Sequence, residues 1–185
     1  MDVEQLMAIW QKASMPALAQ AGLALKQFSG LDFDVTESDV AVVSWDTMSE
    51  RFLRTFQNPL YAVHLRARGL FQAHILTVFS DVNGQRLVSA LMGEAIDLPL
   101  DSMGLSALAE VGNVVGTAFL NVFADLFQTV WEPTTPRVWL TSAEELTREI
   151  APGSRVLMSQ ALFQVTNEEV AAEIVVVPSL GGQAA

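Results

Sequence analysis

One stretch of sequence decides the fold: Ser106-Ala-Leu-Ala-Glu-Val-Gly-Asn-Val-Val-Gly-Thr-Ala-Phe-Leu-Asn-Val-Phe-Ala-Asp-Leu-Phe127. Apolar side chains recur through it at helical spacing, which predicts a helix buried on most of its circumference. Four polar residues interrupt the apolar pattern at intervals of four, three and four: Ser106, Glu110, Asn113 and Thr117. On an α-helix this spacing places them in one row, the polar strip. The polar strip must face water or a partner.

The composition narrows the class of protein. The 185 residues are 51% apolar and 17% charged, which predicts one globular domain with a substantial core. Mean hydropathy is high at +0.34. Even so, no run reaches the ~18 uninterrupted apolar residues of a membrane helix, so residues 106–127 are expected to form a core helix.

Charge and cysteine content exclude several functions. The net charge of −11 argues against nucleic acid or anionic lipid as a ligand, because both need a positive footprint. The chain has no cysteine, which excludes disulfides and thiolate chemistry. Asp2 and Glu4 stand where a secretion signal would carry basic residues, so a cytoplasmic location is expected.

The chain reads as one domain, residues 1–185, with an internal repeat of about 1–98 and 99–178 and a flexible tail at 179–185. Each half opens with a long apolar-periodic helix, followed by a short extended segment and a predicted β-hairpin. The half-to-half offset is about 98 residues. The paired segments are Val3–Phe28 and Met103–Phe127 for the helices, 31–35 and 138–140 for the extended segments, and 61–79 and 155–177 for the hairpins.

Shorter helices are predicted between these elements. Ser142-x-x-Glu145 is a capping box opening a helix to about Ile150, and Thr47-x-x-Glu50 is a candidate cap for another. A third helix is expected over 83–92, ending at Gly93. The predicted fold is therefore an α/β sandwich of the α+β kind, with a mainly antiparallel sheet, two pseudo-symmetric halves and two long helices on one face.

The polar strip extends to a longer motif, because Pro136 completes the pattern S-x3-E-x2-N-x22-P. This pattern and the helix around it resemble the signature of the CheC/CheX/FliY phosphatases of bacterial chemotaxis. The duplicated length makes the chain most similar to stand-alone CheC. Its single motif is what the resemblance associates with CheX.

The first long helix lacks the motif. An offset of 99 residues sets Gln11 against Glu110 and Ser14 against Asn113, so this pair is interpreted as a degenerate first site. The catalytic pair is then present once, in the second half.

The resemblance implies hydrolysis of the aspartyl-phosphate of a CheY-like response regulator. It implies that Asn113 positions the attacking water and that Glu110 pairs with the regulator's active-site lysine. Ser106 and Thr117 would support the strip, and Pro136 would shape the neighbouring loop and strand. No cofactor is expected for this chain, because the bound regulator supplies Mg²⁺. The chain is expected to be a monomer.

A second hypothesis stays open: a CheC-like binding or adaptor module without catalysis, for CheD or for a flagellar or regulator partner. An isolated E-x2-N on an amphipathic helix is usually a solvated face, and turnover by the wild-type chain would separate the two hypotheses.

Other polar residues are interpreted as structural. His64 and His74 have no acidic or histidine partner at metal-ligand spacing, so partly buried structural histidines are expected. The acidic residues at 32, 34, 37 and 39 are expected to lie in a solvated turn. Gly112 and Gly116 are expected to let the two long helices pack closely.

Overall fold

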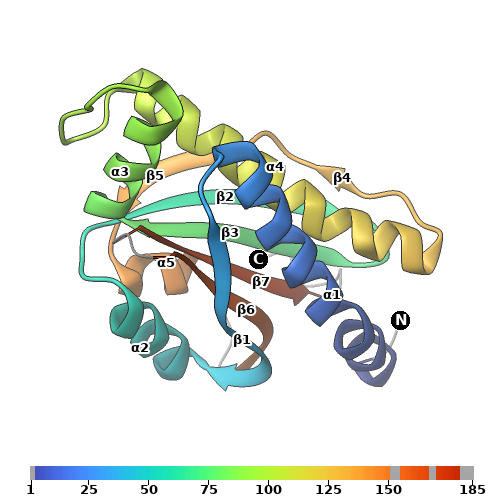
Figure 1. The fold of residues 1–185 in the computed structure, drawn as a ribbon. Helices are drawn as coiled ribbons and strands as arrows, with labels where there is room; N and C mark the ends of the chain where they lie inside the picture. Colours follow the sequence, from blue (N-terminus) through green and yellow to red (C-terminus); the bar gives the residue numbers. More distant parts are fainter. Residues whose placement is uncertain (1–2, 151–154, 167–169, 180–185) are drawn as a thin grey trace.

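The computed structural model describes residues 3–150, 155–166 and 170–179. Each half contains a long helix, a strand, a shorter helix and a pair of strands in that order (Figure 1). The first half ends with a further helix, Asp81–Met92, and the second half also has a two-residue strand, Glu132–Pro133. The elements are α1 (Val3–Ser29), β1 (Phe33–Ser44), α2 (Trp45–Thr55), β2 (Leu60–Arg68), β3 (Gln72–Ser80), α3 (Asp81–Met92), α4 (Ser102–Phe127), β4 (Glu132–Pro133), β5 (Arg137–Thr141), α5 (Ala143–Ile150), β6 (Arg155–Val165) and β7 (Ala171–Ser179).

Seven strands form one sheet in the order β1-β6-β7-β3-β2-β4, with β5 also paired to β2. Every described pairing is antiparallel, including the two predicted hairpins β2–β3 and β6–β7. The strands β1, β2 and β3 of the first half correspond to β5, β6 and β7 of the second. If each strand is replaced by its counterpart, the order β1-β6-β7-β3-β2-β5 becomes the same order read from the opposite edge. The predicted α+β class and mainly antiparallel sheet are confirmed, whereas an origin by internal duplication stays a prediction.

Helices cover both faces of the sheet. The long helices α1 and α4 run antiparallel over one face together with α3, while α2 and α5 cover the other (Figure 1). Side chains alternate along β2 between the two apolar cores: Tyr61 and Val63 join the core under α1 and α4, and Leu60 and Ala62 join the core under α2 and α5. Burial on both faces accounts for the near-continuous apolar run of this strand.

The helix α4 is the one helix in the described part that is long and apolar enough to cross a membrane. Half of that apolar stretch is buried against the rest of the molecule. Gly112 and Phe119 are among its buried residues. The prediction of a core helix is therefore confirmed.

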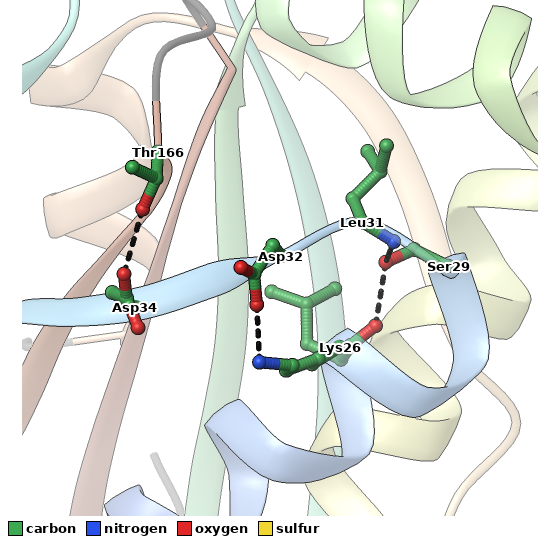
Figure 2. A network of polar contacts seen from close by, with 7 residues as sticks. Lys26, Ser29, Leu31, Asp32, Asp34 and Thr166 are labelled. Carbon is green, nitrogen blue, oxygen red and sulfur yellow. Dashed lines mark hydrogen bonds and ion pairs between the residues drawn. The ribbon is translucent and has the colours of Figure 1, made fainter.

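The acidic cluster was predicted wrongly to be a turn. Asp34, Glu37 and Asp39 lie on β1, which is far longer than the segment 31–35 predicted from sequence and pairs with β6. Asp34 accepts a hydrogen bond from the Thr166 hydroxyl, and Asp32 forms an ion pair with Lys26 of α1 (Figure 2). The charges are exposed because β1 is an edge strand, and charged edges are a usual protection against unwanted strand pairing.

Two element boundaries also differ from the sequence prediction. The helix α2 begins at Trp45. Its cap is Ser44 rather than the predicted Thr47, because Ser44 Oγ accepts the hydrogen bond from the Thr47 backbone N–H. Strand β7 includes Ser179, which the sequence prediction had placed in the flexible tail. The remaining residues of that tail, 180–185, lie outside the described residues.

Candidate functional site

The polar strip lies on the outward face of α4. Ser106 and Glu110 are exposed, and Asn113 and Thr117 are half-buried. Residues on the opposite side of the helix, including Leu108 and Val115, are fully buried. The sequence prediction that these four polar side chains share one accessible row therefore agrees with the structure.

The ends of α4 are fixed by specific contacts. Asp101 is the N-cap and accepts hydrogen bonds from the backbone N–H groups of Met103 and Gly104, at 3.0 and 2.9 Å. The buried Tyr61 hydroxyl accepts a hydrogen bond from the Leu100 N–H at 2.9 Å, which ties the preceding loop to β2. These contacts hold the helix in place one turn before the polar strip begins.

Gly112 sets the distance between α4 and the sheet. A Cβ atom on Gly112 would lie 2.3 Å from Val63 Cγ1 of β2, and one on Gly116 would lie 3.3 Å from Ile75 Cγ2 of β3. The prediction that these glycines serve packing between the two long helices is wrong, because they face the sheet. Because Gly112 has no side chain, the buried side of α4, behind the polar strip, packs directly against β2.

The two central side chains of the strip are available to a partner. Within the described ranges, neither Glu110 nor Asn113 makes an intramolecular hydrogen bond or ion pair, whereas Ser106 Oγ donates to the Ser102 carbonyl at 2.8 Å. A carboxylate and a carboxamide one helical turn apart can bind a cation and orient a water molecule. Ser106 is a supporting residue in this arrangement, since its proton is already used.

Pro136 lies beside the helix rather than in the strip. It is half-buried and directly precedes β5, which contacts α4 at the edge of the sheet. The preceding loop is tied to β2, because Thr134 N–H donates to the Arg66 carbonyl at 2.8 Å and its hydroxyl accepts from the Arg66 N–H. Pro136 therefore lies where this loop meets β5, and its role in shaping the loop and strand stays a prediction.

The structure changes the alignment of the first helix. At an offset of 98 residues every buried position of α1 falls on a buried position of α4, from Leu6 on Gly104 to Leu25 on Phe123. At the offset of 99 used in the sequence comparison most of these matches are lost. Ser14, the expected counterpart of Asn113, is fully buried.

The corrected alignment sets Lys12 against Glu110 and Met15 against Asn113. Gln11 and Ser14 are therefore not the equivalents of the catalytic pair. Sequence periodicity did not separate the two offsets, because α1 contains buried alanines where α4 contains larger apolar residues, and because its buried Ser14 aligns with Gly112.

The two histidines form a separate polar cluster on the face covered by α5. His64 Nε2 lies 2.9 Å from His74 Nδ1, and His64 Nδ1 lies 4.0 Å from the Glu149 carboxylate. Sequence spacing did not reveal this contact, since strand pairing brings residues ten positions apart together, but the burial of His64 agrees with the expected structural role. In the part of the chain that the structure describes, no group of three or more His, Cys, Asp or Glu side chains is arranged to hold a metal ion.

Comparison with known proteins rests on solved structures. No family model and no curated protein sequence matches the chain. FliY from Thermotoga maritima is 15% identical with a TM-score of 0.67, covering 97% of this chain and 91% of that one. CheX from Borrelia burgdorferi, in a complex with CheY, BeF3 and Mg²⁺, is 14% identical with a TM-score of 0.65, covering 90% and 97%. CheX from Desulfovibrio desulfuricans is 13% identical with a TM-score of 0.63, covering 91% and 99%.

This chain has the CheC-like fold. The likeness extends over nearly the whole length of both chains, so the helices and strands from α1 to β7 belong to the CheC-like fold. It agrees with the fold that the motif implied. Because CheX and FliY match equally well, the CheC-like fold does not single out stand-alone CheC.

Proposed function

We propose that this chain is a phosphatase that hydrolyses the aspartyl-phosphate of a CheY-like response regulator in chemotaxis signalling. The observation that carries the proposal is the outward placement of Glu110 and Asn113 on α4, accessible and without intramolecular partners among the described residues. The likeness to a CheX solved with CheY supports a CheY-like regulator as the partner. The cytoplasmic location expected from the sequence is part of this proposal.

Asn113 positions the attacking water in this proposal. Its carboxamide oxygen accepts a hydrogen bond from water and its NH2 group donates one, which orients the water without deprotonating it. Water attacks phosphorus in line with the acyl oxygen of the aspartyl-phosphate, the P–O bond breaks, and aspartate carboxylate and inorganic phosphate are released. Such transfers need positioning and charge stabilisation more than covalent chemistry from the catalyst.

Glu110 orients the partner. Its exposed carboxylate pairs with the active-site lysine of the regulator, which aligns α4 over the phosphorylation site. Mg²⁺ bound by the regulator supplies charge neutralisation at the phosphoryl group, so this chain contributes no metal ligand of its own.

The test is the rate of phosphate release from a Mg²⁺-loaded, phosphorylated CheY-like regulator of the same cell. The wild-type chain should accelerate release, and Asn113→Ala and Glu110→Ala should each reduce the acceleration by about a hundredfold or more. Asn121→Ala is the matched control, because Asn121 is an exposed asparagine on the same helix, two turns from Asn113. If the wild-type chain leaves the decay of every such regulator unchanged, the adaptor hypothesis replaces this proposal.

A further inference from the structure

The outward face of α1 carries an exposed apolar strip. Met15, Ala19 and Leu23 recur at intervals of four on the side of the helix opposite its buried residues. Met15 is 46% exposed and Leu23 is 45% exposed. Lys12 continues the row at its N-terminal end. We call Met15, Ala19 and Leu23 the α1 strip.

The α1 strip lies level with the catalytic pair. The two long helices run antiparallel (Figure 1), and the Trp10 ring contacts the rings of Phe119 and Phe123 at centroid distances of 6.0 and 5.2 Å. Moving forward along α1 from Trp10 therefore corresponds to moving back along α4 from these two phenylalanines. Ala19 falls level with the turn that contains Asn113, and Leu23 falls level with the turn that ends at Glu110.

The polar strip is too small to hold a protein by itself. From Ser106 to Thr117 it is about 17 Å long and one helix wide, whereas a specific protein–protein interface needs roughly 800 Å² on each side. Its four residues are polar, and the exposed large apolar side chain that α4 adds on this face is Met103, seven residues before Glu110. Large side chains are the groups that anchor the centre of most interfaces. A regulator seated over Glu110 and Asn113 must extend onto neighbouring surface, and the α1 strip is the apolar surface on the adjacent helix.

We propose that the α1 strip is part of the surface that binds the regulator and provides the binding affinity, while the polar strip beside it carries out the hydrolysis. This inference rests on the proposed function and deepens it. At the structurally equivalent positions within the two strips, α4 carries Asn113 and Thr117 where α1 carries Met15 and Ala19. The polar side chains of one helix are thus matched by apolar side chains on the other, and the two strips contribute differently to one bound partner.

Lys12 adds a favourable charge at the edge of this surface. It occupies the position equivalent to Glu110, so the charge at that position is reversed on α1. A phosphorylated aspartate site is rich in negative charge, which a chain of net charge −11 otherwise repels. The reversal also prevents α1 from pairing with a regulator lysine, so one regulator is bound for each chain.

The experiment compares Leu23→Asp with Val42→Asp. Val42 is 40% exposed and lies on the edge strand β1, so both variants place one carboxylate at an exposed apolar position. Steady-state dephosphorylation gives kcat and KM, and titration with beryllofluoride-loaded regulator gives Kd. Leu23→Asp should raise KM and Kd about tenfold or more with kcat within twofold, because a buried leucine contact is lost and chemistry is not. Val42→Asp should change none of the three.

The outcomes separate this inference from the function on which it rests. Equal KM and Kd for Leu23→Asp, Val42→Asp and wild type, with wild-type turnover intact, would overturn the docking role of α1 and leave the phosphatase standing. A wild-type chain without turnover removes the proposed function instead. Leu23→Met, which keeps an apolar side chain of similar size, should retain wild-type KM. A thermal melt of each variant shows that the fold is kept. If the wild-type chain is a dimer and Leu23→Asp abolishes this dimer without any change in KM, the strip serves self-association and the proposal is contradicted.

Discussion

His64 and His74 share a hydrogen bond across two adjacent strands: Nε2 of one lies 2.9 Å from Nδ1 of the other, and their rings stack at a centroid distance of 5.1 Å. Burial is the main cause that lowers the pKa of His64 to about 3, and electrostatic repulsion from the neighbouring His74, Arg66 and Arg137 contributes to the same shift. Burial also lowers the pKa of His74, with Arg66 adding to the effect and the Glu149 carboxylate opposing it. The pair is therefore held neutral in the folded protein.

We predict that acid destabilises the fold through this pair. Because the folded-state pKa of His64 lies below the value of about 6.5 in the unfolded chain, the unfolded state binds more protons, and stability is full above pH 6.5 and falls as the pH drops toward 3. Between pH 7 and pH 5 the loss from His64 should be about 2 kcal/mol. Urea unfolding at several pH values measures it, and the variant His64→Gln should show a flatter profile over this range. An unchanged slope in that variant would contradict the assignment.

Reversing the charge of Glu110 should stop catalysis without affecting the fold. Glu110→Lys gives α4 the charge that α1 carries at its equivalent position, Lys12, and a lysine would repel the regulator's lysine. We expect kcat/KM for dephosphorylation to fall at least about a hundredfold, with little change in melting temperature since the position is exposed. Asp125→Lys makes the same change in net charge about 22 Å further along the helix and should leave the rate near wild type. A comparable loss in both variants would mean that only net charge matters.

Gly112→Ala should destabilise the protein by about 1–3 kcal/mol, because its Cβ would overlap Val63 Cγ1 at 2.3 Å. Gly116→Ala is the matched control: its Cβ meets Ile75 Cγ2 at 3.3 Å, and the higher helix propensity of alanine offsets the tighter contact. Denaturant melts measure both. Combining Gly112→Ala with Val63→Ala should cost less than the sum of the two single changes, and strict additivity would show that the two groups do not touch.

Asp101→Ala should loosen the start of α4. It removes the acceptor for two backbone N–H groups and should cost about 1 kcal/mol in unfolding free energy, whereas Asp101→Asn should cost less. Hydrogen exchange of the amides at 103 and 104 locates the effect. Protection of both amides equal to wild type would argue against this cap.

Sequence reasoning reached the fold because its main signals are local. The 3.6-residue periodicity identified both long helices, the alternating and continuous apolar runs identified the strands of both hairpins, and the spacing from Ser106 to Thr117 placed the polar strip correctly. Ser142 also caps α5 as predicted, with its hydroxyl accepting from the Glu145 N–H at 3.2 Å, while the Glu145 carboxylate accepts from the Thr141 hydroxyl at 3.2 Å.

The errors share a physical cause, since each depended on contacts between distant parts of the chain. Strand register brings His64 and His74 together, the approach of the sheet determines what Gly112 faces, and pairing with β6 extends β1 far beyond the segment 31–35. The register of α1 against α4 likewise follows from packing, which buries Ser14 and exposes Met15. Local propensity contains none of this information.

The interleaving of the two halves has a consequence for synthesis of the protein. The only described neighbour of β1 is β6, and the pair Phe33↔Val165 joins residues from opposite ends of the chain. The polypeptide leaves the ribosome from its N-terminus, so β1 emerges early. Its partner β6 is synthesised only after most of the remaining chain. Until then its backbone donors and acceptors are open to other chains, and the acidic side chains that line it protect the nascent protein from aggregation during that interval.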